Sequence, residues 1–227
     1  MNAVVLASGG LDSTVTAAVA KQDGCILHLL TISYGQRHEV EIDRARRVGK
    51  ALGAASHTVL TLDLRTIAES ALTGSGPVPK DRSAAAGEGR IPDTYVPARN
   101  TIFLAVGAAY AETRSASRIY FGANVIDYSG YPDCRPEYLR AFEEVLRLGT
   151  RAGVEGRTIE IRAPLLMMTK ADIIRLGVSL AVPLHLTHSC YDPAVDGKAC
   201  GHCDSCLIRL EGFRQAGATD PIAYVAH

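Results

Sequence analysis

The stretch Ala3-Val4-Val5-Leu6-Ala7-Ser8-Gly9-Gly10-Leu11-Asp12-Ser13-Thr14 decides the fold class of this chain. It begins with an apolar run that is typical of a buried strand, and from Leu11 onward it has the composition of a helix start. The two glycines between these parts allow a tight turn, which points the unpaired N–H groups and the positive end of the helix toward any bound anion. Ser8 and Ser13 add hydroxyl donors. The stretch therefore predicts a phosphate-binding turn between a strand and a helix.

This turn differs from two familiar nucleotide-binding patterns. It has neither the Gly-x-x-x-x-Gly-Lys-Ser/Thr pattern of a P-loop nor the Gly-x-Gly-x-x-Gly pattern of a dinucleotide-binding fold. The pattern Ser-Gly-Gly-x-Asp-Ser resembles the PP-loop of ATP pyrophosphatases. That resemblance implies that the loop binds the β- and γ-phosphates of ATP while the α-phosphate is attacked, and that Asp12 helps to hold Mg²⁺. The ATP-binding residues that it implies are Ser8, Gly9, Gly10, Leu11, Asp12 and Ser13.

Composition argues against several classes of protein. The chain has 227 residues, which suits one large domain or one domain with an appendage. Lysine plus arginine and aspartate plus glutamate both number 24, so no general positive field attracts a nucleic acid or an anionic membrane. No stretch approaches the length of a membrane span, and the N-terminus lacks the basic region of a secretion signal. We therefore expect a cytoplasmic protein that binds neither membrane nor nucleic acid.

Apolar, β-branched runs recur along the chain with helical segments between them. The runs predicted as strands are residues 3–7, 25–32, 58–64, 118–122 and 158–163. The spacing of apolar residues predicts helices over 40–52, 101–113 and 137–151. This βαβ alternation predicts an α/β fold, in which an open parallel five-stranded sheet carries helices on both faces.

The composition changes at two places along the chain. Residues 74–97 are rich in glycine, proline and alanine, which predicts a mobile lid or a disordered loop. After Leu184, cysteine, histidine, glycine and aspartate become prominent. We expect an ATP-binding domain over residues 1–184 and a small C-terminal zinc module over residues 185–227.

In an open parallel sheet, ligands bind outside the carboxyl ends of the strands, so the residues after each strand are candidates for the site. After the second predicted strand stand Tyr34, Gln36, Arg37 and His38, which offer an aromatic ring, an amide, a guanidinium and an imidazole. This combination suits a planar ligand that carries a charge. The alternative is an ordinary helix start with charged residues on its surface.

Two helix starts further along the chain add cations at the same edge. Arg99 and Asn100 follow Pro97 at the start of the alanine-rich helix, where they predict a second anion site. Lys170 opens a later helix after Thr169, a predicted N-cap, and its charge is placed there to neutralise phosphate. Each of these residues also suits a solvated helix surface, so their assignment depends on the neighbouring motifs.

The loop over residues 124–136 follows the fourth predicted strand and is rich in hydrogen-bonding groups. We interpret it as the pocket for a second substrate, with Asn124, Asp127, Tyr128 and Asp133 as candidate binding residues. Either aspartate can accept the N–H groups of a guanine-like edge, and a tyrosine ring can stack on its face. The alternative is a loop that is held only by its own turns.

Cys190, Cys200, Cys203 and Cys206 form the pattern Cys-x9-Cys-x2-Cys-x2-Cys. This spacing is typical of a tetrahedral zinc site, and four thiolates leave no open position for catalysis, so we expect a structural Zn²⁺. An iron–sulfur cluster is the alternative, because three closely spaced cysteines also suit cluster ligation. Cys25 lies within a predicted strand and is a candidate core residue.

Together these motifs resemble the 7-cyano-7-deazaguanine synthase family of the queuosine pathway, and the resemblance runs nearly end to end. It rests on residues 8–14, 34–38, 96–100, 127–136, 189–191 and 200–206. The resemblance implies an ATP-dependent conversion of 7-carboxy-7-deazaguanine and ammonia into a nitrile, through an acyl-adenylate and an amide, with release of AMP and pyrophosphate. It also implies a homodimer with one structural Zn²⁺ in each subunit and with Mg²⁺ bound alongside ATP.

The mechanism that the resemblance implies needs no nucleophilic side chain. The substrate carboxylate attacks the α-phosphate, ammonia displaces AMP, and the resulting amide is adenylated in turn. Positioning and charge neutralisation by Mg²⁺, Arg99 and Lys170 would supply most of the acceleration, and Asp12 would help to hold the Mg²⁺. The sequence departs from the family pattern at His188 and Pro193, which both stand beside the cysteines.

Three alternatives share parts of this pattern. A sulfur- or lysidine-type tRNA-modifying enzyme has the same ATP loop, but the neutral net charge gives no sign of an RNA-binding surface. A zinc-dependent module that binds nucleic acid is opposed by the same neutral charge and by the few aromatic residues near the cysteines. A relative that adenylates a different acceptor, such as a protein or a peptide, would keep the ATP loop.

Overall fold

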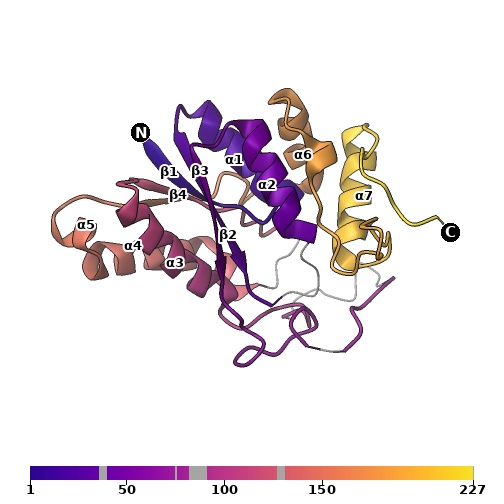
Figure 1. Cartoon of the computed structure of the whole chain (residues 1–227), viewed down its shortest axis with the longest axis horizontal. Helices are drawn as coiled ribbons and strands as arrows, with labels where there is room; N and C mark the ends of the chain where they lie inside the picture. The colour runs from indigo at the N-terminus through magenta and orange to yellow at the C-terminus, as the bar shows by residue number, and fades with distance from the viewer. Residues whose placement is uncertain (36–39, 75, 82–90, 127–130, 227) are drawn as a thin grey trace.

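The computed structural model describes residues 1–35, 40–74, 76–81, 91–126 and 131–226 (Figure 1). In this part of the chain, five strands form one parallel sheet in the order β3-β2-β1-β4-β5. The strands are β1 (Asn2–Leu6), β2 (Ile26–Ser33), β3 (Ser56–Thr61), β4 (Arg118–Tyr120) and β5 (Glu160–Arg162). The strand order reverses between β1 and β4, and the carboxyl ends of these two strands are the expected place for a ligand. The predicted α/β fold with an open five-stranded parallel sheet is confirmed.

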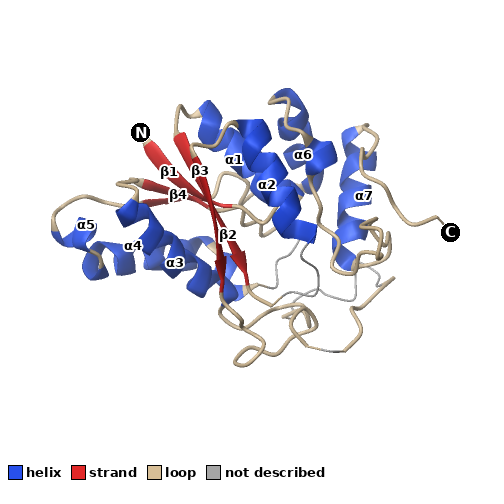
Figure 2. Ribbon diagram, in the orientation of Figure 1, coloured by secondary structure: helices blue, strands red, loops and turns tan. Residues whose placement is uncertain are grey.

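Helices cover both faces of the sheet, as the sequence predicts (Figure 2). The α-helices are α1 (Leu11–Gln22), α2 (Val40–Leu52), α3 (Arg99–Thr113), α4 (Pro136–Gly149), α5 (Arg151–Val154), α6 (Lys170–Ser179) and α7 (Asp204–Ala216). Helices α1, α2, α6 and α7 pack on one face, and α3, α4 and α5 pack on the other. None of the described helices has the length and hydropathy that a membrane span needs.

Side chains along β1 point alternately to two halves of the core. Val4 and Leu6 pack in the half that contains α3 and α4, whereas Ala3 and Val5 pack with α1, α2 and α6. Because successive residues of a strand face opposite sides of the sheet, a strand that is covered on both faces is apolar throughout. This explains why continuous apolar runs, without polar alternation, predict these strands.

The observed strands differ from the predicted runs at their ends. β3 begins at Ser56 rather than at Thr58. β4 ends at Tyr120 and β5 at Arg162, whereas the apolar runs that predict them continue to residues 122 and 163. Pairing continues for one residue past the end of β4, since the N–H of Phe121 donates to the carbonyl oxygen of Arg162 in β5 over 2.8 Å. Side chains after a strand can stay buried although regular pairing has stopped, so hydrophobicity overestimates the length of the short strands.

The first part of the predicted lid, residues 74–97, is packed against the C-terminal region. Val78 is buried in a cluster with the four cysteines. Lys80 forms an antiparallel bridge with Cys203. Residues 82–90 lie outside the described residues, so a lid function for this segment stays a prediction.

The C-terminal region packs closely on the sheet domain. α7 lies beside α6, and Gly212 permits the close approach, because a Cβ at this position would lie 2.4 Å from Cγ of Lys170. Phe213 of the same helix is buried in the half of the core that contains α1 and α6. The division of the chain at residue 184 stays a prediction, and the two parts share this core.

Candidate active site

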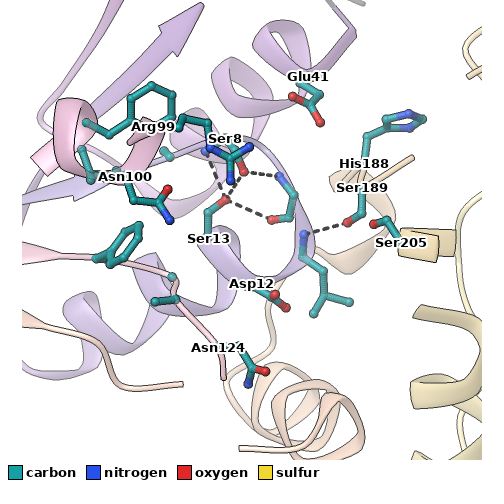
Figure 3. A pocket seen from close by; sticks show the side chains of 18 of the residues that line it. Ser8, Asp12, Ser13, Glu41, Arg99, Asn100, Asn124, His188, Ser189 and Ser205 are labelled. Atoms are coloured by element: carbon teal, nitrogen blue, oxygen red, sulfur yellow. Dashed lines mark hydrogen bonds between the residues drawn. The ribbon is translucent and has the colours of Figure 1, made fainter. Parts of the chain in front are cut away.

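The loop over residues 8–13 turns tightly at the carboxyl end of β1 and leads into α1 (Figure 3). Gly9 has a φ of +81°, in the left-handed region that favours glycine. A Cβ at Gly9 would lie 2.6 Å from both the carbonyl oxygen of Glu41 and the backbone nitrogen of Ala45, so any side chain there would push α2 away. Gly10 is the N-cap of α1 and has an extended backbone. The glycine at position 9 therefore serves both the turn and the close approach of α2.

Two serines fasten this loop from within. The hydroxyl oxygens of Ser8 and Ser13 lie 3.0 Å apart, and the N–H of Ser8 donates to Oγ of Ser13 over 3.2 Å. The N–H of Gly10 donates to Oγ of Ser8 over 3.2 Å. Gly122, just after β4, lies against the turn, where a Cβ would be 3.2 Å from Cα of Ser13. These contacts hold the first turn of α1, with its N–H groups, at the carboxyl edge of the sheet.

Residues from the C-terminal region complete the loop. Oγ of Ser189 accepts the N–H of Leu11 over 3.2 Å, and the N–H of His188 donates to the carbonyl oxygen of Gly9 over 2.9 Å. Ser189 directly precedes Cys190, the first of the four clustered cysteines. The predicted phosphate loop and the predicted metal site are therefore adjoining parts of one structure.

Asp12 and Lys170 form an ion pair beside this loop. Nζ of Lys170 lies 2.7 Å from both carboxylate oxygens of Asp12. The lysine is the first residue of α6, and Oγ1 of Thr169 accepts the N–H of Asp172, which confirms the predicted N-cap. The lysine side chain is 13% exposed and the aspartate side chain 29%, so the pair is better shielded than a surface ion pair and still reaches solvent. One cation and one anion thus lie next to the first turn of α1.

A cavity of about 290 Å³ opens over the loop and over the carboxyl ends of β1, β2 and β4. Aromatic rings from separate segments line it, namely Tyr34, Phe103, Phe121, Tyr131 and Tyr191. Such rings suit the faces of a flat heterocycle. The predicted site residues that line this cavity are Ser8, Gly10, Leu11, Asp12, Ser13, Tyr34, Arg99, Asn100, Asn124, Lys170 and Cys190.

Cys190, Cys200, Cys203 and Cys206 are buried and converge on one point. Their four Sγ atoms lie within 4.8 Å of one another, and the Cys200–Cys206 and Cys190–Cys203 pairs are each separated by 4.0 Å. Four sulfurs at about 2.3 Å from a tetrahedral Zn²⁺ lie roughly 3.8 Å apart, so the observed spacing fits a bound metal. The sequence prediction that these four residues form a metal-binding cluster agrees with this geometry.

Backbone N–H groups surround these sulfurs. Sγ of Cys190 accepts the N–H groups of Asp192 and Cys200 over 3.3 and 3.2 Å. Sγ of Cys200 accepts those of His202 and Cys203 over 3.4 and 3.3 Å. Donors in this arrangement stabilise negative charge on sulfur, which is the form in which cysteine binds a metal.

The chain matches the model of the family described as queuosine biosynthesis protein QueC over residues 2–217. It belongs to this family. A 7-cyano-7-deazaguanine synthase from Kineococcus radiotolerans is 57% identical to it over 222 residues, which cover 98% of this chain and 97% of that protein. A protein of the same name from Solidesulfovibrio magneticus is 56% identical over 223 residues, which cover 98% and 95%. The family resemblance that the sequence motifs predict is confirmed.

The fold of this QueC family member also occurs in more distant proteins. The solved structure of an NMN synthetase from Francisella tularensis has a TM-score of 0.50 at 16% sequence identity, and the match covers 96% of this chain and 78% of that one. At this level of identity the similarity concerns the fold alone.

In this QueC family member, Asn100 in the first turn of α3 is hydrogen-bonded to Asp133 in the short 3-10 helix Pro132–Cys134. The N–H and the Nδ2 of Asn100 donate to the carboxylate of Asp133 over 3.0 and 3.1 Å. Asp133 is 5% exposed and lies behind the wall of the cavity. The contacts of Asn100 and Asp133 with a substrate stay predictions. A substrate group that binds the same atoms would have to compete with the hydrogen bonds between these two residues.

Arg99, the first residue of α3, extends over two aromatic rings of the cavity. Its guanidinium carbon lies 5.6 Å from the ring centroid of Tyr34 and 5.9 Å from that of Phe103. Ala98, just before it, has a φ of +53°, which is strained for a residue with a Cβ. Backbone strain next to a binding cavity is often maintained by functional constraint.

Asn124 ties two loops together at the same edge of the sheet. Its Nδ2 donates to the carbonyl oxygens of Leu165 and Met168 over 3.0 and 2.5 Å, and its Oδ1 accepts the N–H of Ile126 over 3.1 Å. Its predicted contact with substrate stays a prediction. The predicted site residues Gln36, Arg37, His38, Asp127 and Tyr128 lie outside the described residues.

Sequence reasoning missed several residues that line the cavity, above all Glu41, Ser189 and Tyr191. Glu41 stands in the first turn of α2, where burial raises the pKa of its carboxyl to about 7 and the charge of Arg99 opposes that rise. Only weak signs in the sequence indicate that these three residues belong to the site. Glu41 closely follows the polar group at residues 34–38, and Ser189 and Tyr191 flank the first clustered cysteine.

Proposed function

We propose that this protein converts 7-carboxy-7-deazaguanine and ammonia into 7-cyano-7-deazaguanine with ATP, releasing AMP and pyrophosphate. The observation that carries the proposal is the turn at residues 8–13, with the Asp12–Lys170 pair beside it, at the floor of a cavity walled by aromatic rings. The 7-cyano-7-deazaguanine synthases from K. radiotolerans and S. magneticus support the choice of substrate, because the similarity covers nearly the whole of each chain.

The turn after β1 is the proposed site for the pyrophosphate end of ATP. The first turn of α1 offers N–H groups and the positive end of the helix dipole, and Lys170 adds a full charge. The proposed ATP-binding residues are Ser8, Gly9, Gly10, Leu11, Asp12 and Ser13, and the proposed catalytic residues are Asp12, Arg99 and Lys170. The residues proposed to bind the second substrate are Tyr34, Gln36, Arg37, His38, Asn100, Asn124, Asp127, Tyr128 and Asp133.

Mg²⁺ is the proposed companion of ATP, and Asp12 is its proposed protein ligand. Hard cations of this kind take carboxylate and phosphate oxygens, and Asp12 reaches solvent beside the phosphate loop. When bound, the cation neutralises phosphate charge. With Asp12 so engaged, Lys170 is free to turn its ammonium group to phosphate oxygens.

The proposed chemistry proceeds in two activation steps. The carboxylate of the deazaguanine acid attacks the α-phosphorus of ATP, an O–P bond forms, and the bond to pyrophosphate breaks. Ammonia then forms a C–N bond with the acyl carbon, AMP leaves with the bonding electron pair, and a proton passes from nitrogen to solvent. A second ATP activates the amide oxygen in the same way, and loss of AMP together with the two nitrogen-bound protons gives the nitrile. Arg99 and Lys170 act by positioning and by charge, with no covalent intermediate on a side chain.

The proposed metal of the cysteine cluster is a structural Zn²⁺. Four buried thiolates leave no coordination position for water or substrate. Elemental analysis of the purified protein is expected to find one zinc per chain. Iron with acid-labile sulfide in its place would establish the iron–sulfur alternative.

The proposed assembly is a homodimer that acts without nucleic acid. The family resemblance supports the dimer, and the equal numbers of basic and acidic residues, 24 each, argue against a nucleic-acid surface. Sedimentation analysis with and without tRNA tests both points. A monomer, or a complex with tRNA that persists at physiological salt, would contradict them.

The activity itself is tested by incubating the protein with 7-carboxy-7-deazaguanine, ATP, Mg²⁺ and ammonium, and by following AMP and the base by mass spectrometry. The expected products are the nitrile and AMP. The Asp12→Ala variant is expected to lose both products while it stays folded, and the exposed Asp43→Ala variant on α2 serves as its control. AMP without nitrile would mean that the acceptor is a different acid. Full activity of Asp12→Ala would contradict the assigned ATP site.

A further inference from the structure

Glu41 reaches the cavity from α2, on the side of the phosphate loop away from Asp12 (Figure 3). Its backbone is fixed there by Gly9, since a Cβ at that glycine would lie 2.6 Å from the carbonyl oxygen of Glu41. The backbone of Glu41 therefore packs directly against the loop over residues 8–13, next to the place proposed for the reacting phosphates.

Asp12 and Glu41 are the carboxylates that line the cavity in the part of the chain that the structure describes. Asp12 is paired with Lys170, whose Nζ lies 2.7 Å from each of the two carboxylate oxygens. For Glu41 the same described residues show no hydrogen bond or ion pair to the carboxylate, and its charged neighbour is Arg99. The other titratable or charged side chains that line the cavity are Tyr34, Arg99, Tyr131, Cys134, Lys170, His188, Cys190, Tyr191 and Arg209.

A carboxylate that is largely removed from water without donors of its own is costly to keep ionised. Burial accordingly raises the pKa of Glu41 to about 7, although Arg99 works in the opposite direction. A ligand that brings N–H donors and a positive charge would satisfy both carboxylate oxygens. A group whose pKa lies near the working pH is also well suited to accept a proton.

Ammonia, the nitrogen donor of the proposed function, is such a ligand in its protonated form. In neutral solution it is present mainly as ammonium, which has no lone pair and cannot attack a carbon atom. Before it reacts it must lose a proton, and a base in the cavity allows that loss to take place close to the activated acyl group.

We propose that Glu41 binds ammonium in the cavity and removes its proton, so that ammonia is released beside the acyl-adenylate. This inference rests on the proposed function and adds to it the residue that handles the nitrogen substrate. Ammonium and the glutamate carboxylate give ammonia and a neutral glutamic acid. The lone pair so freed forms the C–N bond while the bond from the acyl carbon to AMP breaks. The nitrogen then loses its remaining extra proton to water, and Glu41 returns its own proton to solvent before the next cycle.

The test separates adenylation from amine transfer in Glu41→Gln, with Glu137→Gln as a control in the exposed first turn of α4. The first measurement is exchange of pyrophosphate into ATP with 7-carboxy-7-deazaguanine and Mg²⁺ alone, which needs no amine. The second is product formation with ammonium at neutral pH. The third uses hydroxylamine, which is already unprotonated at this pH and traps the acyl-adenylate as a hydroxamate.

The expected result is selective. In Glu41→Gln, product formation from ammonium falls by roughly 100-fold, the size typical of a lost general base, while exchange and hydroxamate formation stay at the level of the unmodified protein. Glu41→Asp is expected to fall between the two, because it keeps a carboxylate at a greater distance. Hydroxamate formation also shows that the variant is folded.

Three outcomes would overturn the inference. Equal losses of exchange, hydroxamate and ammonium-dependent product would mean that Glu41 serves the binding of ATP or of the acid. An unchanged rate with ammonium would mean that the glutamate plays no part in the reaction. Absence of exchange in the unmodified protein with this acid would overturn the proposed function itself, and the inference with it.

Discussion

The starts of α1 and α3 look alike in the sequence but differ in the structure. Both follow a turn at the carboxyl edge of the sheet, and both carry polar or charged residues in the first turn. At α1 the N–H of Leu11 meets the hydroxyl of Ser189, and Asp12 is paired with a lysine from another helix. At α3 the N–H of Asn100 already meets the carboxylate of Asp133 over 3.0 Å.

The difference shows that the positive end of a helix predicts an anion without saying where the anion comes from. At α3 the anion is a carboxylate of the protein itself, and Arg99 is the residue that extends over the cavity rings. At α1 the supporting groups are hydroxyls and a lysine. We therefore expect loss of the Lys170 charge beside α1 to lower activity more than stability. Loss of the Asp133 acceptor at the start of α3 is expected to lower stability by more than the loss of Lys170 does, while Arg99 stays a proposed catalytic residue.

After the complete loss expected for Asp12→Ala, a large effect on catalysis is also expected for Lys170→Met. This change keeps much of the bulk beside Gly212 but removes the charge that lies 2.7 Å from Asp12, so pyrophosphate release is expected to fall by roughly 100-fold. Steady-state assay of AMP formation measures the loss, and thermal unfolding shows that the fold persists. Lys198→Met is the control, since that lysine pairs with Asp196 at the exposed surface. Normal activity of Lys170→Met would remove the lysine from the mechanism.

The largest effect on stability is expected for Asp133→Ala. The change removes the carboxylate that accepts the N–H and Nδ2 of Asn100 at a buried position, and Nδ2 keeps only Sγ of Cys134 at 3.2 Å. The buried N–H is left without this acceptor, which costs about 1–3 kcal/mol of unfolding free energy. Urea unfolding of this variant and of the exposed Asp43→Ala measures the difference. A large loss of activity at unchanged stability would show that Asp133 faces the substrate, and the contrast between the two helix starts would fail.

A smaller effect is expected for Ser189→Ala, which removes the acceptor of the Leu11 N–H at the start of α1. A neutral hydrogen bond of this kind contributes about 1 kcal/mol, so the KM for ATP is expected to rise by roughly fivefold. Initial rates at varied ATP concentration measure the change. Ser179→Ala is the control, because its hydroxyl donates to a carbonyl at the exposed end of α6. Equal KM values for the two variants would mean that Ser189 does not support the loop.

The smallest effect is expected for Ala98→Gly, which relieves the positive φ at the N-cap of α3. Relief of left-handed strain outweighs the greater freedom of the unfolded chain, so stability is expected to rise by up to about 1 kcal/mol. Ala105→Gly, at an exposed position within the same helix, is expected to lower stability by about as much. Thermal unfolding of both variants shows whether each change raises or lowers the stability. A loss of stability in both would show that the turn at Ala98 is not strained.

The features that sequence predicted well are those coded over short distances. The strands follow from apolar runs, most of whose residues are buried in the central strands β1, β2 and β4. The glycine turn after β1 and the cluster of cysteines follow from fixed spacings. The hydrogen bond between Leu11 and Ser189 joins residues that are 178 positions apart, and no local sequence pattern predicts it. Glu41 was missed for a related reason, because its place in the cavity depends on how closely α2 packs against Gly9.

Polar loops show a different limit of sequence reasoning. Composition indicates that the loop over residues 124–136 is rich in donors and acceptors, and this predicted a substrate pocket. The structure shows that Asn124 bonds to backbone carbonyls and that Asp133 bonds to Asn100. A sequence counts such groups but does not show which of them bond within the protein.

The adjacency of Ser189 and Cys190 makes the cysteine cluster more than a distant anchor. The residue that meets the N–H of Leu11 is joined by one peptide bond to a residue whose sulfur belongs to the cluster. A metal bound at the cysteines would therefore restrict the motion of Ser189, and through it the motion of the loop over residues 8–13. If metal binding at the cysteines favours the ligand-binding form of this loop, thermodynamic linkage requires that a ligand in the loop favours metal binding by the same free energy.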